Sequence, residues 1–379
     1  MIRPPARGGP IVPTVRRARQ AVTISYRLGG DDGVSVEARK WARALGELGF
    51  STRRVAGAFD DEGEPEDVAI PSLALDADGS TDPDAVRRAL DGADLVIVDN
   101  VCSLPINVEA ARAVAAAATA HTGRVLFRHH DLPWQRRNQR QLEREFPPHV
   151  AGALHATINL RSRRDLEARG YGGATTIHNY FDLNPPPGER AATRARFGFE
   201  PDDFVCFQPA RAIERKNVSG GLRFAQRLQQ SRPEFDVRYW LSGPAEDGYA
   251  PTLERILDRA PLPVTLGRAP TAADAYAATD LVVFPSTWEG FGNPVIESVA
   301  ARRACAAFPY PVLPEITAAG VRVFSTESPE TLTKFFAEAP EVRERYHDVN
   351  VHRARLSFDL SDLPAAIDQT FVAHGWASW

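Results

Sequence analysis

Two glutamates with seven residues between them, Glu289 and Glu297, flank a loop that contains two glycines. Gly290 and Gly292 let the backbone approach a ligand closely and adopt positive φ angles. Amide groups at the start of a helix attract an anion. Because two carboxylates would repel that anion, we expect them to bind neutral hydroxyl groups, and the vicinal diols of sugars are good candidates.

The elements that must position these glutamates can be predicted from the same stretch. The apolar run Leu281–Phe284 indicates a buried strand. Asn293 is a good helix cap and Pro294 suits the first helical position, so a helix is expected to begin there. The segment is therefore predicted to be strand, glycine loop and helix. The alternative is an ordinary capped helix with both carboxylates facing solvent.

A basic pair follows the predicted strand Phe204–Gln208. Arg211 and Lys216 lie five residues apart, in a sequence that contains only three lysines. An arginine can fork onto phosphate oxygens, and a lysine adds a point charge. The pair indicates a phosphate-binding loop, in which Arg215 is a possible substitute. The alternative is an ordinary basic loop.

Two histidines and an aspartate follow the predicted strand Val125–Phe127. They are His129, His130 and Asp131, with Arg128 before them. Open α/β sheets bind ligands beyond the carboxyl ends of their strands, which favours a site role for one histidine. In the alternative, one histidine packs in the sheet edge and the other is hydrogen-bonded locally.

The glutamate motif resembles the Glu-x7-Glu signature of retaining GT-B glycosyltransferases, especially glycosyltransferase family 4, the glycosyl transferases group 1. The Gly-Phe-Gly sequence after the first glutamate strengthens the resemblance. It implies that Glu289 is a catalytic residue contacting the donor sugar and that Glu297 holds the nucleotide ribose. The amides of Gly290, Phe291 and Gly292 are then expected to hold the donor diphosphate.

Other residues gain expected roles from the same resemblance. Arg211 and Lys216 are expected to grip the donor diphosphate. His130, followed by aspartate, resembles a family His-Asp pair and is expected to reach the donor sugar from the other domain as a catalytic residue. Gly267 and Arg268 follow a predicted strand, where the family frames the nucleotide base.

The acceptor side is expected in the first half of the chain. A predicted strand, the Gly29-Gly30 turn and a predicted helix form a phosphate-cradling layout, although the turn departs from G-x-G-x-x-G. The resemblance implies that this turn lies against the donor and the acceptor, whereas a simple strand-helix turn is the alternative. Trp134, Arg136 and Arg137 are also expected to line the acceptor side.

Composition excludes several classes of protein. The 379 residues carry a net charge of −4, which gives no nucleic-acid-binding signature. The three scattered cysteines indicate a reducing compartment and neither a disulfide framework nor a zinc site. No apolar run reaches membrane-spanning length, so a cytoplasmic protein is expected. Asp76 and Asp78 resemble a metal-binding Asp-x-Asp, but their polar context favours a solvated loop, and no metal is expected.

Fold and domains follow from the alternation of predicted strands and helices, which indicates parallel sheets. We expect a GT-B fold, with two Rossmann-like domains facing across a cleft. The proline run at 185–188 cannot continue a helix and marks the linker. The expected parts are a disordered basic lead-in at 1–19, an N-terminal acceptor domain at 20–184, the linker at 185–188, a C-terminal nucleotide-sugar domain at 189–360, and a helix at 361–379 that returns to the N-terminal domain.

The function expected from the resemblance is a hexosyltransferase-type glycosyltransferase (EC 2.4). It would move a sugar with retention, from a UDP- or GDP-linked donor to a hydroxyl acceptor, without metal or another cofactor. Three alternatives stay open: a GT-B sugar-nucleotide epimerase, a GT-B phosphorylase with pyridoxal phosphate, and an inactive nucleotide-binding scaffold. The charged set around Glu289 and Lys216 argues against a scaffold, which needs neither residue.

Overall fold

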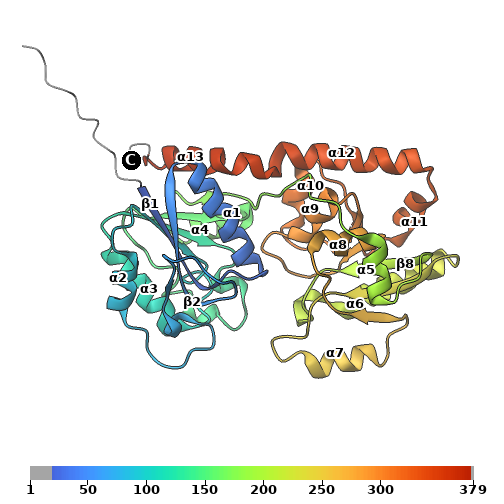
Figure 1. Ribbon diagram of the computed structural model, residues 1–379, viewed down its shortest axis with the longest axis horizontal. Coiled ribbons are helices and arrows are strands. Elements are labelled where there is room, and N and C mark those ends of the chain that lie inside the picture. The colour runs from blue at the N-terminus through green and yellow to red at the C-terminus, as the bar shows by residue number, and fades with distance from the viewer. Residues whose placement is uncertain (1–18, 377–379) are drawn as a thin grey trace, which may run out of the picture.

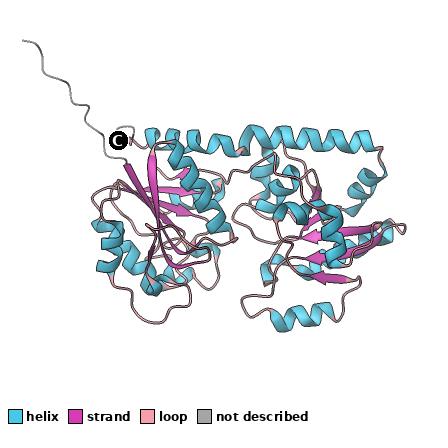
Figure 2. Cartoon of the chain, viewed as in Figure 1, coloured by secondary structure: helices cyan, strands magenta, loops and turns pink. Residues whose placement is uncertain are grey.

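The computed structural model describes residues 19–376, which form two α/β domains lying side by side (Figure 1). Each domain is built on a sheet of parallel strands covered by helices (Figure 2). Nearly all of the predicted lead-in at 1–19, and the last three residues of the predicted tail, lie outside the described residues. The two layered domains agree with the predicted pair of Rossmann-like domains.

The first sheet has seven strands within the described residues, in the order β3-β2-β1-β4-β5-β6-β7, and every neighbouring pair is parallel. Helices cover such a sheet on both faces, which explains why every residue of β4 is buried. The strands are β1 (Arg19–Leu28), β2 (Phe50–Phe59), β3 (Val68–Ala69), β4 (Leu95–Asp99), β5 (Arg124–His129), β6 (Leu154–Thr157) and β7 (Thr175–Thr176). The helices are α1 (Gly33–Glu47), α2 (Pro83–Leu90), α3 (Val108–Ala120) and α4 (Leu160–Glu167).

The second sheet has six parallel strands in the order β10-β9-β8-β11-β12-β13. Its strands are β8 (Asp203–Gln208), β9 (Asp236–Leu241), β10 (Val264–Leu266), β11 (Leu281–Phe284), β12 (Ala304–Ala307) and β13 (Phe324–Ser325). The helices of this half are α5 (Arg190–Phe197), α6 (Val218–Ser231), α7 (Ala250–Leu257), α8 (Ala272–Ala278), α9 (Asn293–Ala300), α10 (Leu313–Ala318), α11 (Pro329–Ala337) and α12 (Pro340–Phe358).

Both sheets reverse their strand order at one point, between β1 and β4 in the first and between β8 and β11 in the second. Ligands of open α/β sheets bind at such switch points, beyond the carboxyl ends of the strands. The loops that leave β1, β8 and β11 carry the Gly29-Gly30 turn, the basic pair and Glu289, and β4 ends at Asp99. The topology therefore selects the loops on which most of the predicted site residues lie.

The last two helices run along one edge of the molecule and connect the domains (Figure 1). At the end of α12, Phe181 donates its amide to the carbonyl oxygen of Phe358 over 2.8 Å, and its own carbonyl accepts from the amide of Leu360 over 2.9 Å. The final helix, α13 (Leu363–Ala373), buries Ile367 and Phe371 in a cluster with Trp41 and other residues of the first domain. The tail thus packs on α1 through its apolar face.

The predicted elements near the site are well matched, with one correction at the helix cap. Strand β11 has the predicted bounds, whereas the strand predicted at Val125–Phe127 is longer and runs from Arg124 to His129. The helix cap is Gly292, with φ of 104°, and not Asn293 as predicted. The Asn293 side chain instead accepts a hydrogen bond from Asn179 Nδ2 over 2.9 Å, a partner that local sequence does not reveal. No helix within residues 19–376 is long and apolar enough to cross a membrane.

Candidate functional site

Glu289 lies at the centre of a buried charge cluster at the carboxyl end of β11. Its carboxylate accepts hydrogen bonds from Lys216 Nζ over 2.6 Å and from Arg215 Nη1 over 3.0 Å. Both cations come from the 3₁₀ turn Glu214–Lys216, which follows β8. Two cations share one carboxylate, so the cluster keeps an excess positive charge that can attract an anion.

The pKa shifts in this cluster have clear causes. Burial opposes the ionisation of Glu289, but Lys216 and Arg215 outweigh it and hold the pKa of Glu289 below its ordinary value. Burial lowers the pKa of Lys216, and Arg215 acts in the same direction, while Glu289 opposes both. Glu289 is therefore ionised at neutral pH, and it is held in place by two charge-assisted hydrogen bonds.

Arg211 lies apart from this cluster. It is exposed, and its guanidinium pairs with Glu246 over 2.5 Å. Arg215, which the sequence indicated only as a substitute, lies beside Glu289 in its place. A spacing of five residues placed both cations on one loop, but it did not determine which arginine turns inward.

The glycine loop after Glu289 contacts the first domain. A Cβ added to Gly290 would lie 2.5 Å from the carbonyl oxygen of His130, so only glycine fits there. The carbonyl oxygen of Gly290 accepts a hydrogen bond from Asn159 Nδ2 over 2.6 Å. The side chain of Phe291 is buried in the core, and Tyr310 Oη donates to its carbonyl oxygen over 3.0 Å. Phe291 can therefore contact a ligand only through its backbone.

Glu297 faces the same region from the first turns of α9. Its carboxylate accepts a hydrogen bond of 2.6 Å from the hydroxyl of Tyr276, a buried residue on α8. Burial raises the pKa of Glu297, and the hydrogen bond from Tyr276 opposes this shift. Lys40 and Glu37, both on α1 of the first domain, also act on the charge of Glu297. Glu297 therefore lies where the two domains approach each other.

His130 is attached to a buried chain of charges in the first domain. Its Nε2 lies 2.9 Å from Asp99 Oδ1, at the end of β4. Asp99 also accepts from Arg128 Nη1 over 3.2 Å, and Arg128 Nη2 donates to Glu37 over 3.2 Å. Lys40 Nζ completes the chain with a bond of 2.6 Å to Glu37. His130 is thus fixed in orientation by groups whose own positions are fixed.

Asp99, the carboxylate that holds His130, is ionised. Burial would raise the pKa of Asp99, but Arg128 and His130 outweigh it and hold that pKa below its ordinary value. Asp99, Arg128 and Glu37 are each almost fully buried. Because Asp99 occupies Nε2 of the imidazole, Nδ1 of His130 is the ring nitrogen left for another partner.

His129 has a different environment, because it packs inside the sheet, as the alternative interpretation of the histidine pair expected for one of the two. It is completely buried in β5, with Nδ1 2.6 Å from Ser103 Oγ and Nε2 2.9 Å from His155 Nδ1. Burial, together with His155 and His130, holds the pKa of His129 well below its ordinary value. His129 is a neutral, hydrogen-bonded core residue, so of these two histidines it is His130 that lies at the domain junction.

The comparisons with known proteins agree with this geometry. Residues 204–339 match the family model described as glycosyl transferases group 1. The mannosylglucosylglycerate synthase of Thermotoga maritima is 25% identical, over 80% of this chain and 83% of that protein. The enzyme of the same name from Petrotoga mobilis is 23% identical, over 76% of this chain and 82% of that protein. Anabaena Alr3699/HepE in complex with UDP and glucose has a TM-score of 0.72 at 16% identity, over 94% of this chain and 100% of that chain.

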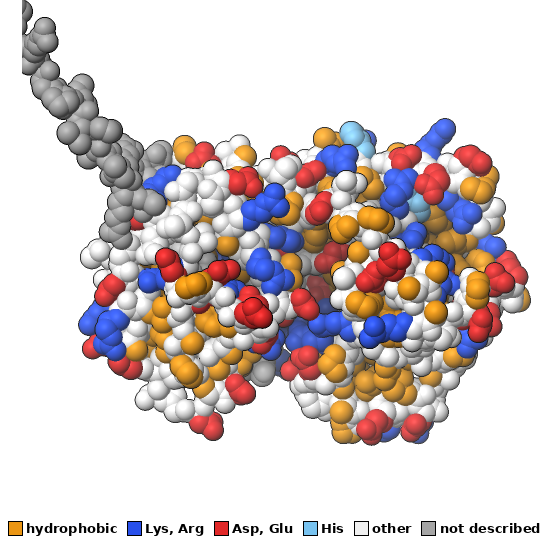
Figure 3. Space-filling view, viewed as in Figure 1, with side chains coloured by type: hydrophobic (Ala, Val, Ile, Leu, Met, Phe, Trp, Pro, Cys, Tyr) orange, Lys and Arg blue, Asp and Glu red, His pale blue; other side chains and the backbone are white. Residues whose placement is uncertain are grey.

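The chain is a GT-B glycosyltransferase. The predicted fold is thereby confirmed, as is the predicted enzyme class, a hexosyltransferase. In the space-filling view of the glycosyltransferase, charged side chains of both signs gather where its two halves meet (Figure 3).

The Gly-Gly turn of the glycosyltransferase is covered by acidic side chains. A Cβ on Gly29, whose φ is 87°, or on Gly30 would lie 2.5 Å from the carboxyl groups of Asp61 and Asp60 respectively. Arg27 Nε pairs with Asp60 over 3.1 Å, so the turn has counter-charges nearby. A diphosphate directly against this turn would meet two carboxylates, whereas neutral hydroxyl groups would find acceptors.

Two other predicted regions have clear positions. Gly267, with φ of 132°, accepts a hydrogen bond at its carbonyl oxygen from Trp240 Nε1 over 2.8 Å. Arg268 is exposed and pairs over 3.3 Å with Asp31, next to the Gly-Gly turn of the other domain. An exposed pair of this kind contributes little to stability, but it places Arg268 of the second domain opposite the Gly-Gly turn of the first.

The prediction that Trp134 lines the acceptor side is wrong. Trp134 is buried in a cluster with Leu132, Leu166 and Tyr171, and its Nε1 donates to Asp165 over 3.3 Å. These partners could not be predicted from the local sequence, because most of them lie more than thirty residues away along the chain. Of the two arginines expected beside it, Arg136 pairs with Asp131 over 2.7 Å and Arg137 is exposed.

Sequence reasoning also missed the contact that crosses the domains at the start of α4. The carboxylate of Glu315, on α10, accepts from the amides of Leu160 over 2.7 Å and Arg161 over 3.0 Å. Its Oε2 also lies 3.3 Å from Nε2 of His178. A carboxylate at a helix N-terminus is favourable. The available signal was an acidic residue a few positions after β12, but nothing local indicated its partner.

The described residues contain no group of three or more His, Cys, Asp or Glu side chains that could hold a metal ion. Asp76 and Asp78 are exposed in a loop after a short 3₁₀ helix, as the sequence indicated.

Proposed function

We propose that the protein transfers a glycosyl group, with retention of configuration, from a nucleotide sugar to a hydroxyl acceptor at the junction of its domains. The observation that carries the proposal is the cluster of Glu289, Lys216 and Arg215 beside a glycine loop that touches His130. It combines excess positive charge, the backbone amides of a glycine loop and an ionised carboxylate in one place. A nucleotide diphosphate with an attached sugar has the complementary chemistry.

The diphosphate is held by Lys216, Arg215 and the amides of the Gly290–Gly292 loop at the start of α9. Arg211 can join them when its exposed pair with Glu246 opens. These donors stabilise the negative charge that develops on the diphosphate as the bond to the sugar breaks. Each key donor of this kind is typically worth about 3–4 kcal/mol of transition-state stabilisation.

The sugar lies between Glu289 of the second domain and His130 of the first. As the glycosidic bond breaks, its electrons pass to the leaving diphosphate and positive charge develops on the sugar, which the carboxylate of Glu289 stabilises. The acceptor oxygen forms the new bond on the same face and gives its proton to a diphosphate oxygen. Glu297 holds the ribose, Gly267 and Arg268 border the base, and Gly29 and Gly30 face the acceptor.

The identity of the donor and acceptor can be narrowed by the similar proteins. The names of the two similar enzymes describe synthesis of a mannosylated glucosylglycerate, and the similar Anabaena structure binds UDP and glucose. We therefore propose a hexose donor linked to UDP or GDP, with mannose and glucose as first candidates. The proposed acceptor is a hydroxyl of a small polar glycoside.

A thermal-shift panel tests the proposal. We expect UDP-glucose or GDP-mannose to raise the melting temperature, because a ligand that binds only the folded state stabilises it by mass action. Lys216→Ala should abolish the shift, whereas Glu246→Gln, which frees Arg211 and leaves Lys216 and Arg215 in place, should keep or increase it. No shift with any UDP- or GDP-sugar would refute the donor class. Donor consumption measured with and without an acceptor distinguishes the two enzyme classes, because a transferase requires the acceptor and an epimerase does not.

We expect turnover to survive metal chelation. Two cations and a helix N-terminus neutralise the leaving diphosphate in this proposal, so no divalent ion is required. Initial rates measured with and without EDTA should agree within error. Loss of activity that returns on adding Mg²⁺ or Mn²⁺ would contradict this part of the mechanism.

We expect donor affinity to increase as the pH rises through the raised pKa of Glu297. Burial keeps this carboxyl protonated above its ordinary pKa of 4.5, and only the ionised form accepts two hydrogen bonds from a ribose diol. Binding should therefore be weak at low pH and strengthen above it, with a midpoint higher than 4.5. Titration calorimetry from acidic to neutral pH measures this, and Glu297→Gln should remove the dependence. An unchanged pH profile in that variant would exclude Glu297 as its source.

A further inference from the structure

A cavity lies at the opposite end of the second sheet from the proposed donor site. Its volume is about 510 Å³, which is large enough for a small metabolite. Phe204, Thr279, Asp280 and Ala304 line it at the amino-terminal ends of β8, β11 and β12. The diphosphate-binding residues follow the carboxyl-terminal ends of β8 and β11, so the two places are separated by the full length of the strands.

The charges around this cavity do not cancel. Five guanidinium groups and three carboxylates lie in or next to its wall, which leaves an excess of two positive charges. The arginines are Arg190, Arg194, Arg302, Arg303 and Arg343, and the acids are Asp280, Glu344 and Asp348. Asp280 pairs with Arg190 and Arg194, and the other two acids pair with Arg302.

Part of this arginine cluster has a structural explanation. Arg190, Arg194 and Arg303 donate to backbone carbonyl oxygens between 276 and 279, at the end of α8. Cations stabilise a helix C-terminus, so these three arginines need no ligand. Arg343 has no such role. Its Nε is buried without a hydrogen-bond partner, and no carboxylate of residues 19–376 lies within ion-pair distance of it.

The position of Arg343 adds a second attraction for an anion. It lies in the first turn of α12, a helix of 19 residues whose N-cap, Ala339, makes no side-chain capping bond. Pro340 at this helix start lines the cavity. The N-terminus of a long helix carries a partial positive charge. Burial lowers the pKa of His347, one turn further on, to about 4; Glu344 opposes this shift, and Arg302 and Arg303 add to it.

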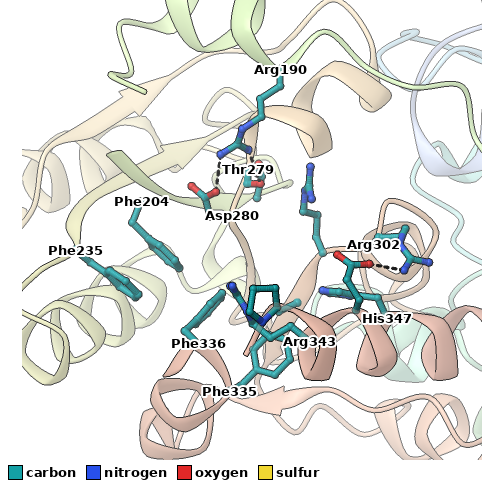
Figure 4. Close-up of a pocket in the computed structure, with 14 residues that line it drawn as sticks. Arg190, Phe204, Phe235, Thr279, Asp280, Arg302, Phe335, Phe336, Arg343 and His347 are labelled. Carbon is teal, nitrogen blue, oxygen red and sulfur yellow. Dashed lines mark hydrogen bonds and ion pairs between the residues drawn. The ribbon is translucent and has the colours of Figure 1, made fainter. Parts of the chain in front are cut away.

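The other side of the cavity is aromatic. Phe204, Phe235, Phe335 and Phe336 lie together, with Arg343 beside them and Arg190 and Arg302 across the hollow (Figure 4). Phe204 and Phe235 stack with ring centroids 4.3 Å apart, and Phe336 meets Phe204 edge-on at 5.0 Å. A ligand that fits both sides has an anionic head and an apolar or planar body.

We propose that this cavity, formed by the start of α12 and the amino-terminal ends of β8, β11 and β12, is a second ligand site that binds a small phosphate monoester. A phosphate monoester carries a charge of about −1.5 to −2 at neutral pH, which matches the excess of two positive charges better than a carboxylate does. Arg343 forks onto its oxygens, and the phenylalanine side accepts its organic part. This site is independent of the proposed transfer reaction.

Titration calorimetry of the full chain with phenyl phosphate, in a buffer free of phosphate, tests the proposal. We expect one equivalent to bind, and we expect inorganic phosphate, which lacks the ring, and benzoate, which carries a single charge, to bind more weakly. Arg343→Gln should reduce affinity for phenyl phosphate about tenfold or more, the usual effect of losing a charge-assisted hydrogen-bond partner. Circular dichroism and melting should show that this partly exposed position leaves the fold unchanged.

Two matched variants keep the test specific. Arg345→Gln removes an exposed arginine of the same helix that does not line the cavity, and it should bind phenyl phosphate as the wild type does. Lys216→Ala, which weakens the donor site, should also leave this binding unchanged. The proposal is overturned if phenyl phosphate does not bind at millimolar concentration, or if benzoate binds as tightly as phenyl phosphate does. It is also overturned if Arg345→Gln loses as much affinity for phenyl phosphate as Arg343→Gln, or if only Lys216→Ala loses affinity.

Discussion

Replacing Glu289 with glutamine is expected to lower kcat by about 10²–10³-fold while donor affinity stays the same or improves. Glutamine keeps the shape of the side chain but removes the charge that faces the reacting sugar. The carboxylate also pairs with Lys216 and Arg215, so its loss raises the net positive charge beside the diphosphate. The ground state is then bound as well as before, and the cost falls on the transition state.

Steady-state kinetics on purified wild type and variant, with varied donor at saturating acceptor, measures this separation of kcat from KM. Glu246→Gln is the matched control, because Glu246 pairs with the neighbouring but exposed Arg211. It should change kcat by less than about fivefold, because an exposed pair contributes roughly 0–1 kcal/mol. A wild-type kcat in Glu289→Gln would place the catalytic centre elsewhere.

Replacing Arg128 with methionine is expected to destabilise the first domain by about 3–5 kcal/mol. Arg128 is only 1% exposed, and it lies between the carboxylates of Asp99 and Glu37, at 3.2 Å from each. Methionine fills a similar volume but leaves both buried acids without this cation. Such a loss is large because each buried acid then keeps only one charged partner, His130 for Asp99 and Lys40 for Glu37, and the pKa of Asp99 should rise when Arg128 no longer lowers it.

Urea unfolding followed by circular dichroism measures this effect, with the two domains treated as separate transitions if they unfold separately. Arg27→Met is the control, since Arg27 forms a partly exposed pair with Asp60 in the same domain. It should change the free energy of unfolding by less than about 0.5 kcal/mol. If Arg128→Met changes it no more than the control does, the buried chain does not stabilise the domain.

The sequence by itself determined the fold class and the loops that carry the site. Apolar runs such as Leu281–Phe284 mark buried strands because each residue of a covered parallel strand is buried, a property that depends only on local composition. The glycine loop and the Glu-x7-Glu spacing could likewise be recognised from neighbouring residues in the sequence. The alternation of strands and helices then led to two parallel sheets, and their carboxyl ends brought the Glu289 loop and the His130 loop together.

Only the tertiary structure decided which side chains meet. Lys216 and Arg215 bind a glutamate more than seventy residues away, and Arg128 binds one 91 residues away. Loop spacing could not distinguish the inward Arg215 from the outward Arg211, since both are flexible side chains on one short segment. The same reason explains the errors at Asn293 and Trp134. A side chain takes the partner that buries or neutralises it best, and that partner is supplied by a distant part of the chain.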